Sequence, residues 1–350
     1  MKKTNFIFPI IVVILLVILL VGVIVDSKIS VNRNLNIKET IAQPTSAFYY
    51  WRTWFSIEER ESELLKKNKI GKLYVRFFDV DINKDHKFSD KCVPVATTTG
   101  LSEIHNVKNI NIVPVVFITP EAIKEYASFT DNLAHRIYAM CASNNINIEE
   151  VQFDCDWTTS THDAYFQFIK AVKRPLQNYF KKDVRLSSTI RLHQLSQIPP
   201  EVDYGVLMCY NTGDFKDYNT KNSILDIEDV KPYLKYLKSY KLPLALALPS
   251  YSWGVEFDKD KKFVCLEKSI WSINDTSNYR HLEDNYYELK KKNPETTIQY
   301  VRYEEISAAT IMEAKKIIRK KSGKLPIVLF HLDAQQLSKY SDDEIKNFFK

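Results

Sequence analysis

Short segments rich in β-branched and aromatic residues alternate along the chain with segments whose apolar positions recur at helical spacing. Segments of the first kind are typical of strands buried in a sheet. Eight of them predict strands, at residues 47–55, 72–81, 111–119, 150–157, 184–192, 204–211, 242–253 and 326–333.

Helical patterns lie between most of these strands, and Pro120 and Ser341 occupy helix-start positions. Strands that alternate with helices form a parallel sheet. Eight such units in one chain predict an α/β fold closed into a (β/α)8 TIM barrel over residues 47–350. An open doubly wound sheet is the alternative. The predicted helices span residues 56–68, 120–143, 161–173, 224–240, 305–321 and 341–350.

One connection is much longer than the others. About 45 residues, at 255–300, follow the seventh predicted strand and contain turn residues and aromatics. Long connections after barrel strands lie at the end of the barrel where ligands bind. We therefore expect an insertion that helps to shape a site.

The first thirty residues have a different character, because Phe6–Val25 is an unbroken apolar run behind Lys2 and Lys3. About 20 apolar residues span a bilayer as a helix. Residues 1–30 therefore predict a transmembrane anchor, with a cleaved signal peptide as the alternative, and residues 31–46 predict a linker. The leading lysines favour a cytoplasmic N-terminus, which places the barrel outside the cytoplasm.

Composition excludes several classes of site. With 7 glycines in 350 residues, the chain has no glycine-rich phosphate loop. Its net charge of +6 comes from dispersed lysines, as in KSYK and IIRKKSGK, which does not favour nucleic-acid binding. We expect no cofactor and no metal, because the five cysteines lie far apart and DVDINKD (79–85) only faintly resembles a calcium loop. No disulfide is assigned, and Cys155 and Cys209 are expected in the core.

The fourth predicted strand carries the sharpest candidate chemistry, in VQFDCDW. Side chains alternate along a strand, so Asp154 and Asp156 share the inward face with Gln152. Two neighbouring carboxylates repel one another, so one should have a raised pKa, which suits an acid or electrostatic role. The alternative is a structural ion pair, for example with Arg76.

Polar and aromatic residues also end most of the other predicted strands. Such a combination is typical of sites that stack and hydrogen-bond sugars. The predicted ligand-binding residues are Trp51, Arg76, Asp79, Asp81, Trp157, Arg191, His193, Tyr210, Asn211, Tyr251, Trp253 and His331.

The order of these motifs resembles family 18 glycoside hydrolases, the chitinase-like barrels. VQFDCDWT (151–158) resembles the second half of that family's DxxDxDxE motif, LMCYN (207–211) its MxYD, and LALALPSYSWG (244–254) its segment ending in PxYG. The resemblance covers residues 47–350 diffusely. It implies a carbohydrate ligand, with Tyr210 positioning an acetamido group.

This chain departs from the family's pattern at the decisive position. Thr158 stands where the family has its general-acid glutamate, Asn211 replaces an aspartate, and His331 stands where a tryptophan is common. A threonine hydroxyl cannot protonate a leaving group near neutral pH, so the family's mechanism cannot be carried over.

Two functions remain open. The first, slightly favoured, is a glycoside hydrolase with Asp156 as the acid, Asp154 as its electrostatic partner, and Asp79, Asp81 or Glu304 as a second carboxylate. The second is a membrane-tethered glycan-binding protein without turnover.

Overall fold

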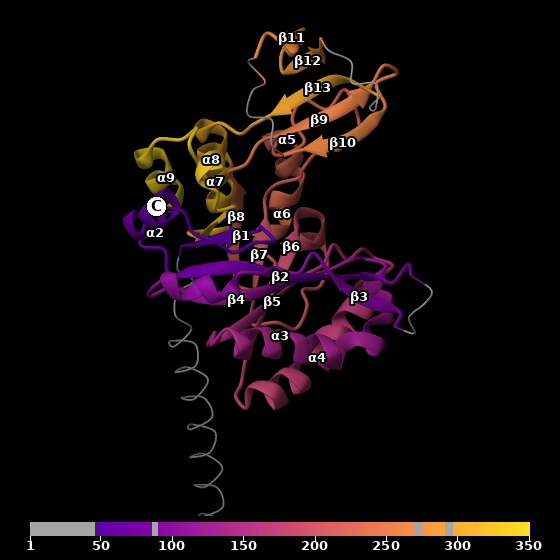
Figure 1. Ribbon diagram of the computed structural model, residues 1–350, viewed down its shortest axis with the longest axis vertical. Coiled ribbons are helices and arrows are strands. Elements are labelled where there is room, and N and C mark those ends of the chain that lie inside the picture. The colour runs from indigo at the N-terminus through magenta and orange to yellow at the C-terminus, as the bar shows by residue number, and fades with distance from the viewer. Residues whose placement is uncertain (1–45, 86–89, 269–272, 274, 291–296) are drawn as a thin grey trace, which may run out of the picture. The chain divides into compact units, whose positions relative to one another are not determined.

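The computed structural model describes residues 46–350 except 86–89, 269–272, 274 and 291–296 (Figure 1). The predicted membrane anchor, residues 1–30, and the linker up to residue 45 lie outside the described residues. Within the described part, no helix is both long and apolar enough to cross a bilayer.

Eight parallel strands form the centre of the fold. Their order is β1-β14-β8-β7-β6-β5-β4-β2, and β2 pairs with β1 to close the ring. The TIM barrel predicted from the sequence is therefore confirmed, and the open sheet is wrong. These strands are β1 (Ala47–Tyr50), β2 (Lys72–Ile82), β4 (Asn111–Ile118), β5 (Glu150–Asp154), β6 (Arg185–Arg191), β7 (Tyr204–Met208), β8 (Leu244–Pro249) and β14 (Ile327–Phe330).

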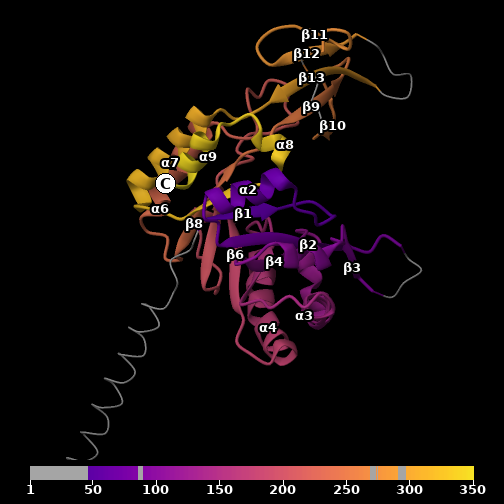
Figure 2. The same cartoon turned by 60° about the vertical axis from the view of Figure 1, so that its left-hand side comes forward.

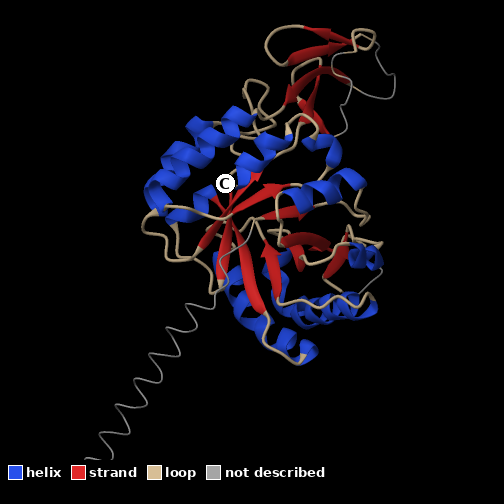
Figure 3. Cartoon of the chain, turned by 90° about the vertical axis from the view of Figure 1, so that its left-hand side faces the viewer, coloured by secondary structure: helices blue, strands red, loops and turns tan. Residues whose placement is uncertain are grey.

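Helices cover the outside of the barrel (Figure 3). Helices α3 and α4 lie side by side in Figures 1 and 2, and the rings of Phe129 and Phe168 meet between them at 5.9 Å. Ser341 begins the last helix as predicted, accepting a hydrogen bond from the backbone N–H of Glu344. The longer helices are α2 (Glu59–Lys67), α3 (Tyr126–Ser143), α4 (His162–Phe180), α7 (Ala308–Ser322) and α9 (Asp342–Phe349).

Two connections are irregular. Among its described residues, the interval between β2 and β4, for which no helix was predicted, holds the strand β3 (Cys92–Val95), antiparallel to β2, and the 3₁₀ helix η1 (Leu101–Asn106). The single helix predicted at 224–240 is wrong, because Pro232 removes a backbone donor and the segment is broken there. The short pieces in these regions and at other helix ends are η2 (Ala122–Glu125), η3 (Leu192–Ser196), α5 (Ile227–Val230), η4 (Lys231–Tyr233), α6 (Leu234–Leu237) and α8 (Ala334–Leu337).

The predicted insertion forms a separate antiparallel sheet above the barrel (Figure 1). It starts at Trp253 rather than at residue 255, so the seventh barrel strand ends earlier than predicted, at Pro249. Its strand order is β10-β9-β13-β12-β11. The strands are β9 (Trp253–Asp258), β10 (Phe263–Glu267), β11 (Tyr279–His281), β12 (Tyr286–Leu289) and β13 (Ile298–Glu304).

The barrel interior is polar toward the amino ends of the strands. Lys72 Nζ lies 2.8 Å from Glu150 Oε2 and 2.6 Å from the hydroxyl of Tyr204. Tyr204 also bonds Glu150 and the hydroxyl of Tyr74. This network satisfies the buried charges, so the interior is a packed core and any site lies at the opposite, carboxyl ends.

Candidate functional site

The two aspartates predicted from the sequence lie at the carboxyl end of β5. Asp154 is its last residue, and Asp156 follows two positions later. Gln152 accepts a hydrogen bond from Tyr49 inside the barrel at 2.6 Å, while Phe153 packs outward on Phe168 of α4. The predicted alternation along this strand is confirmed.

Arg191, the last residue of β6, bridges the two carboxylates. Its Nη2 lies 3.2 Å from Asp154 Oδ1, and its Nε pairs with Asp156. Thr189 Oγ1 donates to the same oxygen of Asp154 at 2.6 Å. The parallel register, in which Gln152 lies opposite Ser187, brings these residues together. The ion-pair partner of the aspartates is therefore Arg191, and the pairing with Arg76 considered from the sequence is wrong.

The two carboxylates differ in their access to solvent. The side chain of Asp154 is 6% exposed and that of Asp156 is 46% exposed. Burial raises the pKa of Asp154; Arg191 opposes this shift, and the charges of Asp156 and Asp79 add to it. The sequence predicted a raised pKa in this pair, assigned to Asp156 through repulsion. In the structure the raised pKa belongs to Asp154, and burial is its largest cause.

A cavity of about 260 Å³ lies beside Asp156. It unites five of the predicted site residues at the ends of β5, β6 and β7. The hydroxyl of Tyr251 donates to Asn211 Oδ1 at 2.6 Å, which fixes the amide at the rim. The described lining residues are Asp156, Arg191, Leu192, His193, Met208, Tyr210, Asn211, Thr212 and Tyr233.

A second predicted group gathers on β1 and β2. Arg76 Nε donates to Asp79 Oδ1 at 2.9 Å, and the guanidinium lies over the ring of Trp51 at 5.4 Å. A bulge between Arg76 and Phe78 lets residues three apart share the inward side. Asp81 instead accepts a hydrogen bond from Thr119 at 3.0 Å.

Comparison with known proteins gives a structural likeness only. No family model matches the chain, and no curated protein matches its sequence. The spore cortex-lytic enzyme SleL of Bacillus cereus is similar at a TM-score of 0.54 and 17% identity, covering 87% of this chain and 74% of that chain. The chain also has the fold of solved family 18 glycoside hydrolases.

Two chitinases of that family show the same likeness. The Cycas revoluta enzyme, solved with (GlcNAc)3, has a TM-score of 0.53 and 10% identity, covering 87% of this chain and 99% of that chain. The chitinase ChiB of Flavobacterium johnsoniae has a TM-score of 0.52 and 14% identity, covering 87% and 94%. At these identities the likeness establishes a distant, glycoside-hydrolase-like barrel and not an activity.

Two predicted stacking residues of this family 18-like barrel are unsuited to that role. Trp157 is 0% exposed and packs against Tyr165 and Phe166 of α4. Trp253 is 7% exposed, and its Nε1 donates to Glu304 Oε2 at 2.8 Å. Neither ring offers an open face to a sugar. Trp54, which follows β1 and is 63% exposed, was not among the predicted site residues.

Thr158 occupies the position of the family's general-acid glutamate in this barrel, and Glu304 does not replace that glutamate. Thr158 is exposed, and its hydroxyl bonds that of Ser160 at 2.9 Å. Glu304 is 0% exposed and accepts hydrogen bonds from Arg302, Ser223 and Trp253. Because its oxygens are occupied and enclosed, Glu304 as the second carboxylate is wrong.

Several lining residues were not in the predicted site. Thr212 and Tyr233 line the cavity, and Thr189 orients Asp154. Thr189 lies on the inward face in the alternation that selected Arg191, so that pattern was a usable signal. The signal for Tyr233 was the neighbouring Pro232, which breaks the helix predicted at 224–240. Among the described residues, no group of three or more His, Cys, Asp or Glu side chains is arranged to hold a metal ion.

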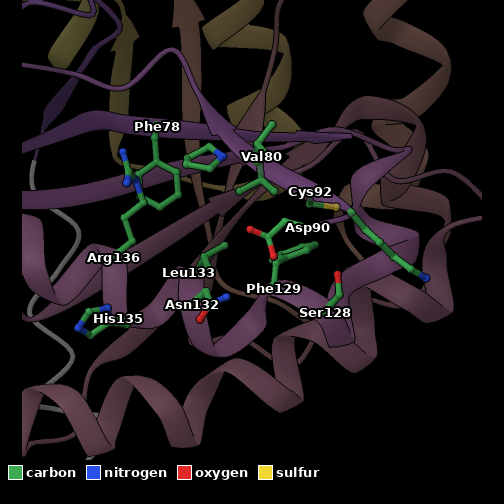
Figure 4. A pocket seen from close by; sticks show the side chains of 13 residues that line it. Phe78, Val80, Asp90, Cys92, Ser128, Phe129, Asn132, Leu133, His135 and Arg136 are labelled. Atoms are coloured by element: carbon green, nitrogen blue, oxygen red, sulfur yellow. The ribbon is translucent and has the colours of Figure 1, made fainter. Parts of the chain in front are cut away.

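A larger cavity lies outside the barrel, between the β2–β3 hairpin and α3 (Figure 4). It measures about 490 Å³. Arg136 lies against Phe78 there, at 5.1 Å from the ring, and donates to Thr97. Phe78 points outward from β2 and Asp79 inward, so this cavity is separate from the aspartate site.

His331 follows β14 and is half-buried. Its Nδ1 has no hydrogen-bond partner among the described residues. Burial lowers the pKa of His331 to about 4, against a partial opposing effect of Asp333. The imidazole is therefore neutral at pH 7 and cannot act there as a cation toward a ligand.

The lowered pKa of His331 predicts a pH-dependent stability. Between pH 6.5 and 4 the unfolded chain binds a proton at this position that the folded chain does not, so the free energy of unfolding falls as pH falls. The loss reaches up to about 3 kcal/mol near pH 4. Denaturant unfolding of wild type and His331→Gln across this range measures it. The free energy of unfolding should fall more steeply with falling pH for wild type than for His331→Gln. Above pH 7 the difference between the two proteins should be constant. Parallel pH curves would contradict the lowered pKa of His331.

Proposed function

We propose that this chain is a carbohydrate-active, glycoside-hydrolase-like barrel that binds a glycan in the cavity beside Asp156. The observation that carries the proposal is the bridge of Arg191 between Asp154 and Asp156, at the rim of a cavity that also holds Tyr210 and Asn211. Carboxylate, guanidinium, amide and phenol groups around one cavity suit the many hydroxyls of a sugar.

Recognition without turnover is favoured over hydrolysis. Asp156, the carboxylate that lines the cavity, is held in an ion pair with Arg191, and Arg191 partly opposes the rise in the pKa of Asp154. Asp154, whose pKa is raised, is enclosed and already bonded to Thr189 and Arg191. The glutamate position holds Thr158. Both described aspartates of the site are therefore engaged by Arg191, and Asp154 is also buried.

The first ligands to test are oligomers of N-acetylglucosamine. The Cycas revoluta chitinase with the same fold was solved with (GlcNAc)3. Tyr210, at the motif position that resembles the family's acetamido-positioning tyrosine, lies in the cavity. Trp54 offers an exposed ring face on the carboxyl side of β1, where an extended glycan can stack.

We place the barrel outside the cytoplasm, tethered by residues 6–25. The apolar run and the two lysines before it support this location. A glycan-binding site on a tethered barrel would hold cell-surface or wall polysaccharide near the membrane.

Hydrolysis is the second candidate, and the closeness of two aspartates favours it. A retaining glycosidase needs carboxyl groups about 5–5.5 Å apart and an inverting one about 6.5–9.5 Å, and residues two apart on one strand lie at roughly 6–7 Å, above the first range and at the lower end of the second. Asp156 reaches solvent, so release from Arg191 by a bound ligand would free it to act as the acid. In that case Asp79 or Asp81 is the remaining source of a further carboxylate.

Asp156→Asn separates the two candidates. The amide keeps the shape of the side chain but can neither donate an acid proton nor pair with Arg191 as an ion. If the barrel only binds, no aryl glycoside or polysaccharide is hydrolysed by either protein, and the affinity for the bound glycan falls by about 10- to 100-fold. Titration calorimetry and a hydrolysis panel measure both properties.

Asp163→Asn is a matched control, because Asp163 is exposed on α4 and lies outside the cavity. Its affinity should equal that of wild type. Hydrolysis by wild type that disappears in Asp156→Asn would establish the enzyme instead. Glycan affinity unchanged in Asp156→Asn would contradict the proposed site.

A further inference from the structure

The amino-end face of the barrel, opposite the candidate site, has an uneven distribution of charge. Seven connections lead from the outer layer into a barrel strand there. Four of them contain lysine and no acid: residues 68–71, 107–110, 238–243 and 322–326. The other three, residues 144–149, 181–184 and 197–203, each contain at least one Asp or Glu.

The four basic connections are neighbours in the barrel. They enter β2, β4, β8 and β14, and the order β8-β14-β1-β2-β4 is continuous around the ring. The exposed lysines Lys69, Lys108, Lys241 and Lys324 therefore form one arc. Lys66 and Lys321, exposed in the last turns of α2 and α7, extend it. We call these six lysines the basic arc.

Contacts within the structure support this grouping. Lys66, Lys69 and Lys108 line one cavity of about 610 Å³. On the other side, Lys315 is buried and close to Arg319, Lys324 and Lys350, and its pKa is lowered to about 8 by burial and by these cations. None of the four loop lysines forms an ion pair with a described residue.

The chain enters the barrel in the middle of the basic arc. The carbonyl of Ser46, just before β1, accepts a hydrogen bond from the backbone N–H of Gly71, and the carbonyl of Gly71 accepts one from Asn111. Residues 26–45 thus connect this face to the apolar run at 6–25. Twenty residues reach at most about 70 Å, so a bilayer that holds the apolar run is within reach of the arc.

We propose that the basic arc rests on the anionic lipid headgroups of the membrane to which the chain is tethered, which turns the glycan site away from the bilayer. The inference rests on the tether in the proposed function. An anionic bilayer attracts lysines at its surface, each contributing about a fivefold factor to association, and only within a Debye length. The connections that carry acids lie on the far side of the ring, so the barrel tilts toward the strands around β1.

The test uses the full chain reconstituted in nanodiscs of phosphatidylcholine alone or mixed with phosphatidylglycerol. A soluble amine-acylating reagent labels exposed lysines, and mass spectrometry gives the rate at each one. We expect the basic arc to be acylated several-fold more slowly in the anionic discs, with the difference lost at about 1 M salt, where the Debye length is about 3 Å. Lys221, Lys259 and Lys262, on the opposite loops and the insertion, should react equally in both discs.

A quadruple variant tests the charge requirement. With Lys69, Lys108, Lys241 and Lys324 changed to glutamine, the reporters Lys66 and Lys321 should lose their protection. The matched control changes Lys216, Lys221, Lys259 and Lys262 to glutamine and should keep it. Equal labelling of the basic arc in the two kinds of disc, or protection that survives in the quadruple variant, would overturn the proposal.

Failure of the tether is seen separately. Extraction of the chain from membranes by alkaline carbonate would contradict the anchor at residues 6–25. Vesicles containing phosphatidylglycerol, added to that extracted chain, would then test the binding of the basic arc to anionic lipid without the tether. Protection of the basic arc from acylation supports this binding, and unchanged labelling overturns it.

Discussion

Arg302→Met is expected to lower the free energy of unfolding by about 3–5 kcal/mol, the cost of removing one partner of a buried ion pair. Arg302 and Glu304 are both 0% exposed, and Arg302 Nε lies 2.6 Å from Glu304 Oε1. Methionine fills similar space but leaves the carboxylate of Glu304 enclosed without a cation. Chemical denaturation monitored by circular dichroism measures the loss.

The same guanidinium holds the loop after β7 against the insertion. Its Nη1 donates to the carbonyls of Asp217 and Tyr218, and its Nη2 to that of Phe215. Glu304 in turn accepts from the backbone and hydroxyl of Ser223. This loop begins at Asn211 and Thr212 of the candidate site, so Arg302→Met should also weaken glycan binding without touching the glycan.

Arg280→Met is the matched control in the same antiparallel sheet. Arg280 pairs with Glu288, but its side chain is 62% exposed, and exposed pairs contribute about 0–1 kcal/mol. In the double variant Arg302→Met, Glu304→Gln the unpaired charge is gone, so part of the lost stability should return. Equal losses in the free energy of unfolding for Arg280→Met and Arg302→Met would show that burial of the ion pair does not determine the loss.

The eight barrel strands could be predicted from the sequence because both faces of a parallel barrel strand are buried, which leaves dense apolar runs. Their carboxyl ends could not. The predicted segments at 47–55, 150–157 and 242–253 overran β1, β5 and β8. Aromatic residues continue past those strand ends to build the loops of the site, and their strand propensity hides the point where pairing stops.

Period-two alternation identified the central part of the candidate site. It placed Asp154, Asp156, Thr189 and Arg191 inward, and they are joined by hydrogen bonds and ion pairs. The same alternation puts Trp157 on the outward face with Cys155, so its burial against α4 was implicit in the pattern. The prediction of Trp157 as a ligand-binding residue, made from the aromatic residues at the strand ends, had given it the opposite role.

Two other features of the site differ from the prediction. Trp253 reads as the end of a barrel strand, but it begins β9, and its indole is enclosed by the insertion. Tyr233 reaches the cavity because Pro232 breaks a helix that the apolar pattern continues. The first outcome depends on elements distant in the chain, whereas the break at Pro232 was a local signal that the predicted helix at 224–240 did not take into account.

Arg191→Met is expected to abolish measurable glycan binding and to lower the free energy of unfolding by about 3–5 kcal/mol at pH 7. Asp154 would remain 4% exposed with Thr189 as its remaining hydrogen-bond donor, beside the uncompensated charge of Asp156. Calorimetric titration and denaturant unfolding measure the two losses independently.

The stability deficit of Arg191→Met should depend on pH with a definite sign. Arg191 lowers the pKa of Asp154, so its removal raises that already raised value further. The folded variant then holds a proton on Asp154 that the unfolded chain releases, and its stability falls as pH rises through the folded pKa. The deficit against wild type should therefore be largest at pH 7 and shrink toward pH 4. A deficit that grows on acidification would contradict the bridging role.

Arg191→Met, Asp154→Asn distinguishes a structural cation from a ligand-binding one. The double variant no longer encloses an unpaired carboxylate, so most of the stability should return. If Arg191 also donates to the glycan, as its place on the cavity wall suggests, affinity stays low, because no lysine and no second arginine among the described residues lines that cavity. Full recovery of both properties would make the triad of Asp154, Asp156 and Arg191 a folding device, and the glycan would then have to bind elsewhere on the barrel.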